Sequence, residues 1–577
     1  MRDFGQRYEM HELLRQFAAE QLDALPDERA ATAEHHSDYY LNFVATRESH
    51  LMHNEPQQAV CEIQHELDNV RQAWLQATNQ RNSALLGKSV GGLVRYYDLA
   101  GLLNESVQAL GRAAEKLENA KAAPLLGTEH ERSQHQLCSK LLALQGSMLM
   151  KQGKFDKGIT TGQAALALAS GAIEGGTYAQ LVVGQGFFRK SQLTEARACF
   201  EHVLALTDRY QQPGSTLDLL IDVEYTAYLW LGQLETELGN FAAAQARYAA
   251  GIRFCQRHNR LRAEVHIRIN HASLLGHMRD YAAARQIYAE FLPITRSLGY
   301  HWSEAIILLE LGDAVRMLGE YTLASELLRH AEVQLAKSGA TLEPIFAYIT
   351  LARLYCYLGT TEQARHWLAR AFGTPMLQES LWLKLMVLLA RAVFGLQTGK
   401  HAQVVNDLQE AIQVGQTLNN PSHQAQGLLL LGHAHSGLQQ WQAAEQSYQQ
   451  ANTIYQKLGN VAVAAEARAG LAWLALTQGE PSRAAALVEE LLPLLQSDTA
   501  IGLDEPFFIY LTCYRILAAL QDPRAHAILS IGHDHLQRYA CHIHDEAVRR
   551  SFLENVTVHR DLKVHYATSS AFPANPL

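Results

Sequence analysis

The stretch LWLGQLETELGNFAAAQARYAAG, Leu229 to Gly251, decides the fold of this chain. It contains two apolar helical segments joined at Gly239, with a small residue, Gly232, in the first and the pair Ala244 and Tyr248 in the second. A spacing of four places that pair on one helical face. The small residue allows the second helix to approach closely, and a glycine after the first helix suits a left-handed C-cap. The stretch therefore predicts a helical hairpin.

The same pattern recurs every 40 residues. The small residue of the first helix stands at Gly232, Ala272, Gly312, Ala352, Ala392, Gly432 and Ala472. The turn position holds Gly239, Arg279, Gly319, Gly359, Gly399, Gln439 and Gly479. The second helix carries Ala244, Ala284, Ala324, Ala364, Val404, Ala444 and Ala484, followed four positions later by Tyr248, Tyr288, Leu328, Leu368, Leu408, Tyr448 and Val488. One hairpin cannot bury its apolar face alone, so seven stacked units are predicted.

These units resemble the tetratricopeptide repeat, and LLELGDAVRMLGEYTLASELLRHA (Leu308 to Ala331) and LLLLGHAHSGLQQWQAAEQSYQQA (Leu428 to Ala451) fit its pattern closely. The period of 40, against about 34 in the usual repeat, is similar to the sensor repeats of the bacterial maltose-regulator type. Weaker units begin at Gly146 and Gly184, and a degenerate one spans Tyr510 to His533. The resemblance implies an all-α, right-handed superhelical solenoid of roughly ten to twelve hairpins.

Segments at both ends of the chain, among them Arg7 to Leu22 and Asp545 to Leu562, resemble bacterial STAND proteins, the signal-transduction ATPases with numerous domains. RYEMHELLRQFAAEQL (Arg7 to Leu22) looks like the close of their winged-helix domain, and HSDYYLNFVATR (His36 to Arg47) and ELDNVRQAWLQA (Glu66 to Ala77) follow in the family's order. DEAVRRSFLENVTVHRDL (Asp545 to Leu562) looks like the end of such a sensor array. The alternative is that all four are generic amphipathic helices.

The expected organisation has four parts. Residues 1–30 would form the end of a winged-helix-like segment, 31–140 an N-terminal helical region with degenerate repeats, 141–495 the repeat array, and 496–577 a degenerate repeat with capping helices.

The STAND nucleotide module needs the phosphate loop GxxxxGK[ST], whose backbone N–H groups wrap the phosphates. Gly87-Lys88-Ser89 matches the end of this motif, but Asn82 stands where its first glycine is needed. We therefore expect no ATP hydrolysis and no enzymatic activity. The resemblance implies the sensor part of a larger protein, or a relative that lost its ATPase core.

Composition excludes several classes. The chain has 577 residues, 48% of them hydrophobic, and a formal net charge of −9. The hydrophobic fraction is enough to form a core. The negative net charge argues against a general nucleic-acid binder, which would be basic. Seven cysteines without a CxxC pair argue against a disulfide framework or a zinc ribbon. With no signal peptide and no apolar run of about 18 residues, a cytoplasmic location away from membranes is expected.

Other candidate chemistry is weak, and no metal or cofactor is expected. Seven histidines gather in the C-terminal region: His526, His533, His535, His542, His544, His559 and His565. A His-x-His spacing on a helix separates the two rings, so a solvated surface is the preferred interpretation over a metal site. SGAIEGGTYAQ (Ser170 to Gln180) is predicted to be a loop between hairpins, with phosphate binding as a weaker alternative.

The concave groove is the better candidate site, because first helices line it in tetratricopeptide arrays. The candidate ligand-binding residues on those helices are Gln233, Ser273, Asp313, Arg316, Arg353, His433 and Trp473. Such a mixed face suits a polar small molecule, a peptide or a protein segment. Two alternatives stay open: any superhelix exposes a polar inner face, and Asp313 can pair with Arg316 three residues on.

The leading hypothesis for function is therefore sensing. A ligand in the groove would favour one packing of the array and thereby regulate the ATPase core of the parent protein, as the resemblance to STAND bacterial regulators implies. The runner-up is a constitutive scaffold that binds partner peptides without switching.

Overall fold

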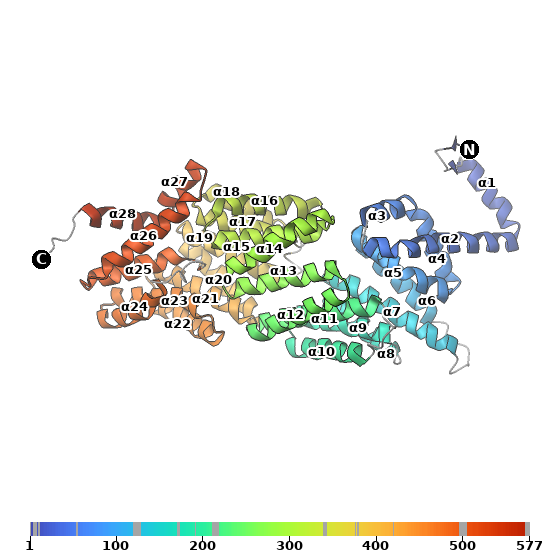
Figure 1. The fold of residues 1–577 in the computed structure, drawn as a ribbon, viewed down its shortest axis with the longest axis horizontal. Helices are drawn as coiled ribbons and strands as arrows, with labels where there is room; N and C mark the ends of the chain where they lie inside the picture. The colour runs from blue at the N-terminus through green and yellow to red at the C-terminus, as the bar shows by residue number, and fades with distance from the viewer. Residues whose placement is uncertain are drawn as a thin grey trace. The chain divides into compact units, whose positions relative to one another are not determined.

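The computed structural model describes residues 2–3, 8–9, 12–52, 56–118, 129–169, 173–190, 192–209, 218–337, 343–374, 377, 380–418, 420–495, 503 and 505–571. Twenty-eight helices occupy nearly all of this described part, together with two short antiparallel strands, β1 (Arg2–Asp3) and β2 (Tyr8–Glu9). Consecutive helices pack as neighbouring pairs (Figure 1). The fold is all-α, as the sequence predicts.

The chain divides into two compact units, Met1–Ala227 and Tyr228–Leu577. The first unit contains α1 (Glu12–Asp23), α2 (Pro26–Met52), α3 (Pro56–His65), α4 (Leu67–Asn79), α5 (Ser83–Leu99), α6 (Leu103–Glu118), α7 (Glu129–Lys151), α8 (Phe155–Leu168), α9 (Ile173–Arg189) and α10 (Leu193–Arg209). Helix α11 (Asp218–Glu237) contributes residues to both units.

The second unit contains the seven 40-residue hairpins apart from the first half of α11. Each hairpin pairs an odd-numbered first helix with the even-numbered helix that follows it, from α11 and α12 to α23 and α24. The helices after α11 are α12 (Phe241–Arg257), α13 (Leu261–His277), α14 (Tyr281–Ser297), α15 (His301–Met317), α16 (Tyr321–Lys337), α17 (Glu343–Tyr357), α18 (Thr361–Phe372), α19 (Leu381–Gln397), α20 (His401–Thr417), α21 (Pro421–Gly437), α22 (Trp441–Lys457), α23 (Val461–Thr477) and α24 (Pro481–Leu495). After the seventh hairpin come α25 (Pro506–Ala519), α26 (Ala525–Cys541), α27 (Glu546–Glu554) and α28 (Thr557–Ala571).

The turn position of every hairpin has the left-handed conformation that the sequence predicts. Its φ is 76° at Gly239 and 82° at Gly319, and it remains positive at Arg279 (66°) and Gln439 (58°). The next N–H reaches back five residues, as in the 2.8 Å bond from Asn240 to the carbonyl of Glu235. This 6→1 bond is the Schellman C-cap, and it recurs in all seven units.

In the three units whose small residue is glycine, an added Cβ would collide with the second helix, whereas alanine occupies this position in the other four. A Cβ added at Gly232 would lie 2.3 Å from the Tyr248 ring, and one at Gly432 would lie 2.5 Å from the Tyr448 ring. Glycine therefore allows the second helix to pack its large residue directly against the first helix, which confirms the predicted role of this position.

One prediction about a loop was wrong. Within Ser170 to Gln180, helix α9 already begins at Ile173, while residues 170–172 lie outside the described part. A Cβ at Gly175 would lie 2.7 Å from the Ser139 hydroxyl, so this glycine serves helix packing against α7 rather than a turn.

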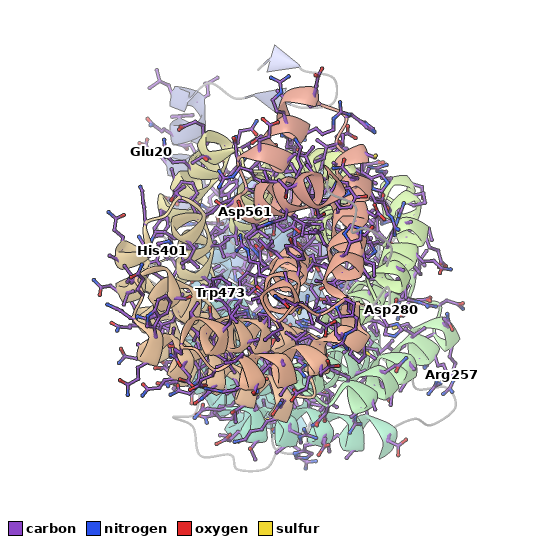
Figure 2. All side chains as sticks on the ribbon, turned by 90° about the vertical axis from the view of Figure 1, so that its left-hand side faces the viewer. Glu20, Arg257, Asp280, His401, Trp473 and Asp561 are labelled. Atoms are coloured by element: carbon purple, nitrogen blue, oxygen red, sulfur yellow. The ribbon has the colours of Figure 1, made fainter. Side chains whose placement is uncertain are left out.

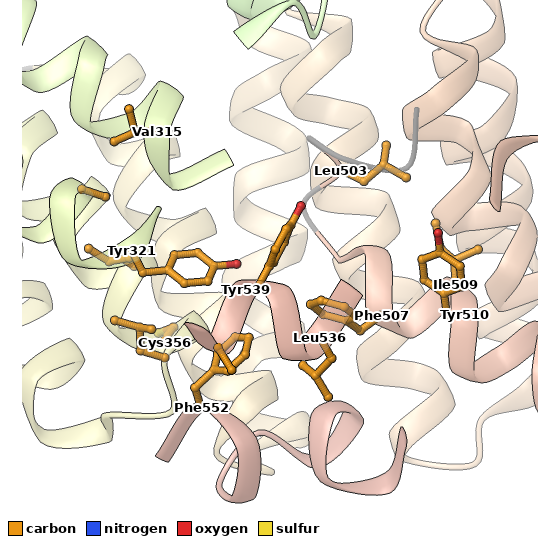
Figure 3. Close-up of a cluster of buried hydrophobic side chains, with 14 of the residues drawn as sticks. Val315, Tyr321, Cys356, Leu503, Phe507, Ile509, Tyr510, Leu536, Tyr539 and Phe552 are labelled. Carbon is orange, nitrogen blue, oxygen red and sulfur yellow. The ribbon is translucent and has the colours of Figure 1, made fainter. Parts of the chain in front are cut away.

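The second unit curves back on itself. The Thr322 hydroxyl at the start of α16 donates to the His542 carbonyl at 2.9 Å and accepts from the His544 N–H at 3.1 Å, across 220 positions in sequence. The Tyr321 ring lies 5.9 Å from that of Tyr539 and 5.6 Å from that of Phe552 (Figure 3). We use the name seam for these contacts of Tyr321 and Thr322, at the start of α16, with residues 539–552 of the C-terminal helices.

In the first unit, buried side chains of α2 to α7 form a separate core. No helix in the described ranges of either unit is both long and apolar enough to cross a membrane.

Candidate functional site

The structure places the predicted groove residues on the first helices of the hairpins of unit 2. Gln233, Ser273, Asp313, Arg353, His433 and Trp473 are half-buried, whereas Arg316 is 7% exposed. Several of them make contacts with different neighbouring helices. The set separates into four parts: the α15 group, the Arg353 environment, the His433–Trp473 end, and the α11–α13 end.

The α15 group combines acid and base on one helix face. Arg316 Nε donates to Asp313 Oδ1 at 2.8 Å, so the pairing that the spacing of three allowed is present. Glu310, one turn before Asp313, is half-buried. Its removal from water, with the negative charge of Asp313 adding to it, raises the pKa of Glu310 to about 7, while the hydroxyl of Tyr288 opposes the rise.

The Arg353 environment contains residues that the sequence did not point to. Asn420 Nδ2 donates to Glu237 Oε2 at 3.3 Å, and its Oδ1 lies 2.9 Å from His423 Nδ1. Burial lowers the pKa of His423 to about 4, and the positive charges of His277 and Arg353 act in the same direction. Helices α11, α13, α17 and α21 thus contribute to one polar environment.

At the C-terminal end of the array, the predicted residues are already bound within the chain. His433 Nδ1 lies 2.8 Å from the Tyr448 hydroxyl, and its Nε2 lies 3.1 Å from Glu466 Oε1, a carboxylate that is 6% exposed. The Phe508 ring of α25 covers the imidazole edge at 5.0 Å. These contacts give His433 a packing role in the described structure.

Trp473 is covered in a similar way. The Arg515 guanidinium of α25 lies 5.7 Å from the Trp473 ring and donates to Asp561 of α28 at 2.8 Å; Trp473 and Asp561 are labelled in Figure 2. At the other end, Gln233 Nε2 donates to Asn270 Oδ1 of the next first helix at 2.6 Å. Near the middle of the array, Glu310, Asp313 and Arg353 are half-buried as well.

The phosphate-loop look-alike lies inside helix α5. Lys88 Nζ donates to Asn42 Oδ1 at 2.5 Å, and the buried Ser89 hydroxyl donates to the Leu85 carbonyl at 2.8 Å. Because the surrounding N–H groups are engaged in the helix, they cannot wrap a phosphate.

Several C-terminal histidines pack against rings. His533 stacks on Tyr566 with centroids 3.8 Å apart, and His559 is fully buried beside Phe507 and Phe552. Across the described ranges, no three His, Cys, Asp or Glu side chains are grouped so that they could hold a metal ion. Of the seven cysteines, none forms a disulfide, and five are buried.

No family model matches this sequence, and no curated protein matches it either. Among solved structures, the chain is similar to a Rap protein complexed with competence and sporulation factor, at 14% identity and a TM-score of 0.48, over 63% of this chain and 97% of that one. It is also similar to a STAND protein with a tetratricopeptide repeat sensor from Pyrococcus horikoshii, at 16% identity and a TM-score of 0.38, over 62% of this chain and 53% of that one.

A third similar structure is the Cut9–Hcn1 hetero-tetramer of APC/C, at 13% identity and a TM-score of 0.46, over 93% of this chain and 98% of that one. At such identities and scores, function has to be argued from the residues of this chain. What the helices, their turns and their pairing establish is the architecture: this is a protein of tetratricopeptide-like helical hairpins.

Proposed function

We propose that unit 2 is a recognition module that binds a polar small molecule, a peptide or a protein segment on its first-helix face. The observation that carries the proposal is the α15–α17 face, where Glu310, Asp313 and Arg353 stay half-exposed although burial has raised the pKa of Glu310 to about 7. Ionisable groups held in such a partly desolvated position are characteristic of binding sites. Charge of both signs there suits charge-assisted hydrogen bonds to a polar ligand.

The finer part of the proposal is regulation of a STAND ATPase core, for which the support is the resemblance of four sequence segments to that family. A ligand can regulate only if it binds one packing of the array more tightly than another. The seam supplies an element whose contacts can be made or lost as a set, because it joins α16 to the C-terminal helices through Thr322 and Tyr321.

A second candidate function is a constitutive scaffold that binds partner peptides without changing shape. The seam also favours this candidate, because contacts across 220 positions restrict the opening of the coil. The two functions differ in whether ligand binding changes the dimensions of the protein in solution.

The test is a thermal-shift screen of the full chain against a panel of sugars, nucleotides, amino acids and pentapeptides. A compound that binds the native state raises the melting temperature by mass action. We expect a hit to be lost in Asp313→Asn and Arg353→Gln variants and kept in Arg365→Gln, an exposed arginine on the second helix α18. A hit that survives both groove substitutions would refute the proposed site.

Small-angle scattering with and without the hit then separates sensor from scaffold. A sensor changes its radius of gyration, and a scaffold does not. For the ATPase link, the decisive observation is whether the reading frame upstream of Met1 encodes a phosphate-loop module.

A further inference from the structure

A strongly basic segment stands apart from the rest of this acidic chain. Between Glu237 and Asp280 there are seven arginines (Arg247, Arg253, Arg257, Arg260, Arg262, Arg268 and Arg279), no lysine, and one carboxylate, Glu264. The chain as a whole has a net charge of −9. The segment includes α12 and α13, and four of the seven arginines, Arg253, Arg257, Arg260 and Arg262, lie close to the junction between these helices.

Elsewhere in unit 2, arginines are commonly neutralised by carboxylates. Such pairs include Arg285–Glu320, Arg296–Glu304, Arg370–Glu332, Arg391–Asp407, Arg483–Glu445 and Arg524–Glu489. By contrast, Arg253, Arg257 and Arg262 make no ion pair with any residue in the described ranges. Glu264 is already engaged, because it accepts from Arg268 at 3.1 Å and from Gln256 at 2.8 Å.

The position of these charges is not explained by helix stability. Arg257, in the last turn of α12, complements the negative end of the helix dipole. Arg260 and Arg262, however, stand at the N-cap and in the first turn of α13, where a positive charge is unfavourable. The charges of Arg257 and Arg260 also add to burial in lowering the pKa of His258. Helix stability therefore accounts for the charge of Arg257 but not for the charges of Arg260 and Arg262.

Exposed apolar side chains flank the same junction. Leu261 is 42% exposed at the start of α13, and Trp302 is 43% exposed at the start of α15. The two first helices meet here, since Arg262 lies over the Tyr300 ring at 5.4 Å and His266 contacts the Trp302 ring at 5.6 Å.

Arg253 and Arg257 lie one helical turn apart on α12, and both are exposed; Arg257 is at the outer edge of the ribbon in Figure 2. We propose that Arg253, Arg257 and Arg262, with Leu261 and Trp302, form a docking surface for an acidic protein segment that also carries apolar side chains. Guanidinium groups bind carboxylates in a bidentate manner, which suits Asp and Glu side chains presented at helical spacing. The exposed Leu261 side chain favours a protein segment that carries apolar side chains over a nucleic acid, which carries none.

The test uses the full chain and fluorescence anisotropy at low salt. The probe is a fluorescein-labelled peptide of four Glu-Glu-Leu repeats, compared with peptides of Glu-Glu-Ser and Gln-Gln-Leu repeats and with an oligo-dT of equal length. We expect saturable binding of the Glu-Glu-Leu peptide that weakens as salt rises, and weaker binding of both other peptides. No saturable binding, equal affinity for all three peptides, or tighter binding of the oligo-dT would each overturn the proposal.

Two variants assign the binding to this surface. Arg253→Glu with Arg257→Glu should weaken binding at least tenfold. The matched control, Arg365→Glu with Arg550→Glu, makes the same charge change at side chains that are 56% and 67% exposed, and should stay within twofold of the wild type. If the charge reversal prevents folding, Arg253→Gln with Arg257→Gln replaces it, with the same direction expected. Equal weakening in the control would show that only the net charge matters, which would refute a local surface.

Discussion

The half-buried Glu310 of the proposed site should make the free energy of unfolding depend on pH. Its folded-state pKa is raised from 4.5 to about 7 by burial and by Asp313, so the folded protein binds a proton there more tightly than the unfolded chain does. Stability from this group is therefore largest at low pH and is lost as the pH rises from about 4.5 through 7. Well above pH 7 the carboxylate is fully charged, and the full penalty for burying it applies.

The substitution Glu310→Gln keeps the shape and removes the charge. A tenfold change in the proton-binding constant corresponds to about 1.4 kcal/mol, so a rise of the Glu310 pKa from 4.5 to about 7 sets an upper bound of about 3.4 kcal/mol. Because the side chain is half-buried rather than fully buried, we expect the variant to be more stable than the wild type by about 1 to 3 kcal/mol near pH 8.5. Near pH 5 the gain should shrink to below about 1 kcal/mol.

The measurement is urea unfolding followed by far-UV circular dichroism near pH 5 and pH 8.5. Glu326→Gln is the matched control, because Glu326 is an exposed glutamate on the neighbouring helix α16. A Glu310→Gln variant that is no more stable at high pH, or whose gain is the same at both pH values, would refute the argument from burial. If the variant also fails to bind the compound found in the screen, the carboxyl group of Glu310 takes part in ligand binding.

Three further outcomes follow from the packing. Gly232→Ala should lower the free energy of unfolding by about 1 to 3 kcal/mol because its Cβ would lie 2.3 Å from a tyrosine ring, whereas Gly276→Ala, with 3.8 Å of room, should be neutral or stabilising; thermal melts compare the two. His559→Phe loses the contact of 2.8 Å between His559 Nδ1 and the Phe552 carbonyl, but it also removes a buried imidazole whose pKa is lowered to about 4. Because the wild type loses stability as the pH falls from 6.5 towards 4, the stability of the variant relative to the wild type should improve over that range. Hydrogen exchange in α25 to α28 measures the difference. Thr322→Val removes both seam hydrogen bonds and should cost about 1 to 2 kcal/mol locally, seen as faster exchange of the His544 N–H, with unchanged exchange in unit 1 as the check.

The hairpins could be predicted from the sequence because each depends on residues within about 20 positions of one another. Gly239 with its positive φ and Gly232 against Tyr248 are local requirements, and a period of 40 repeats them in register. The spacing of three between Asp313 and Arg316 likewise allowed the pair that the structure contains. The loop predicted around Gly175 was wrong because a glycine that serves close helix packing looks the same in sequence as one that serves a turn.

The environment of the site could not be predicted in this way. Whether His433 faces open space or Glu466 depends on the next hairpin, and whether Trp473 is free or covered depends on Arg515 of α25. The contact between Thr322 and residues 542–544 joins positions 220 apart, and no pattern within a repeat encodes it. The sequence by itself determined the repeating unit, because its signals are short-range. Only the tertiary structure decided which of the predicted groove residues are covered by other helices, because curvature summed over several hairpins brings distant helices together.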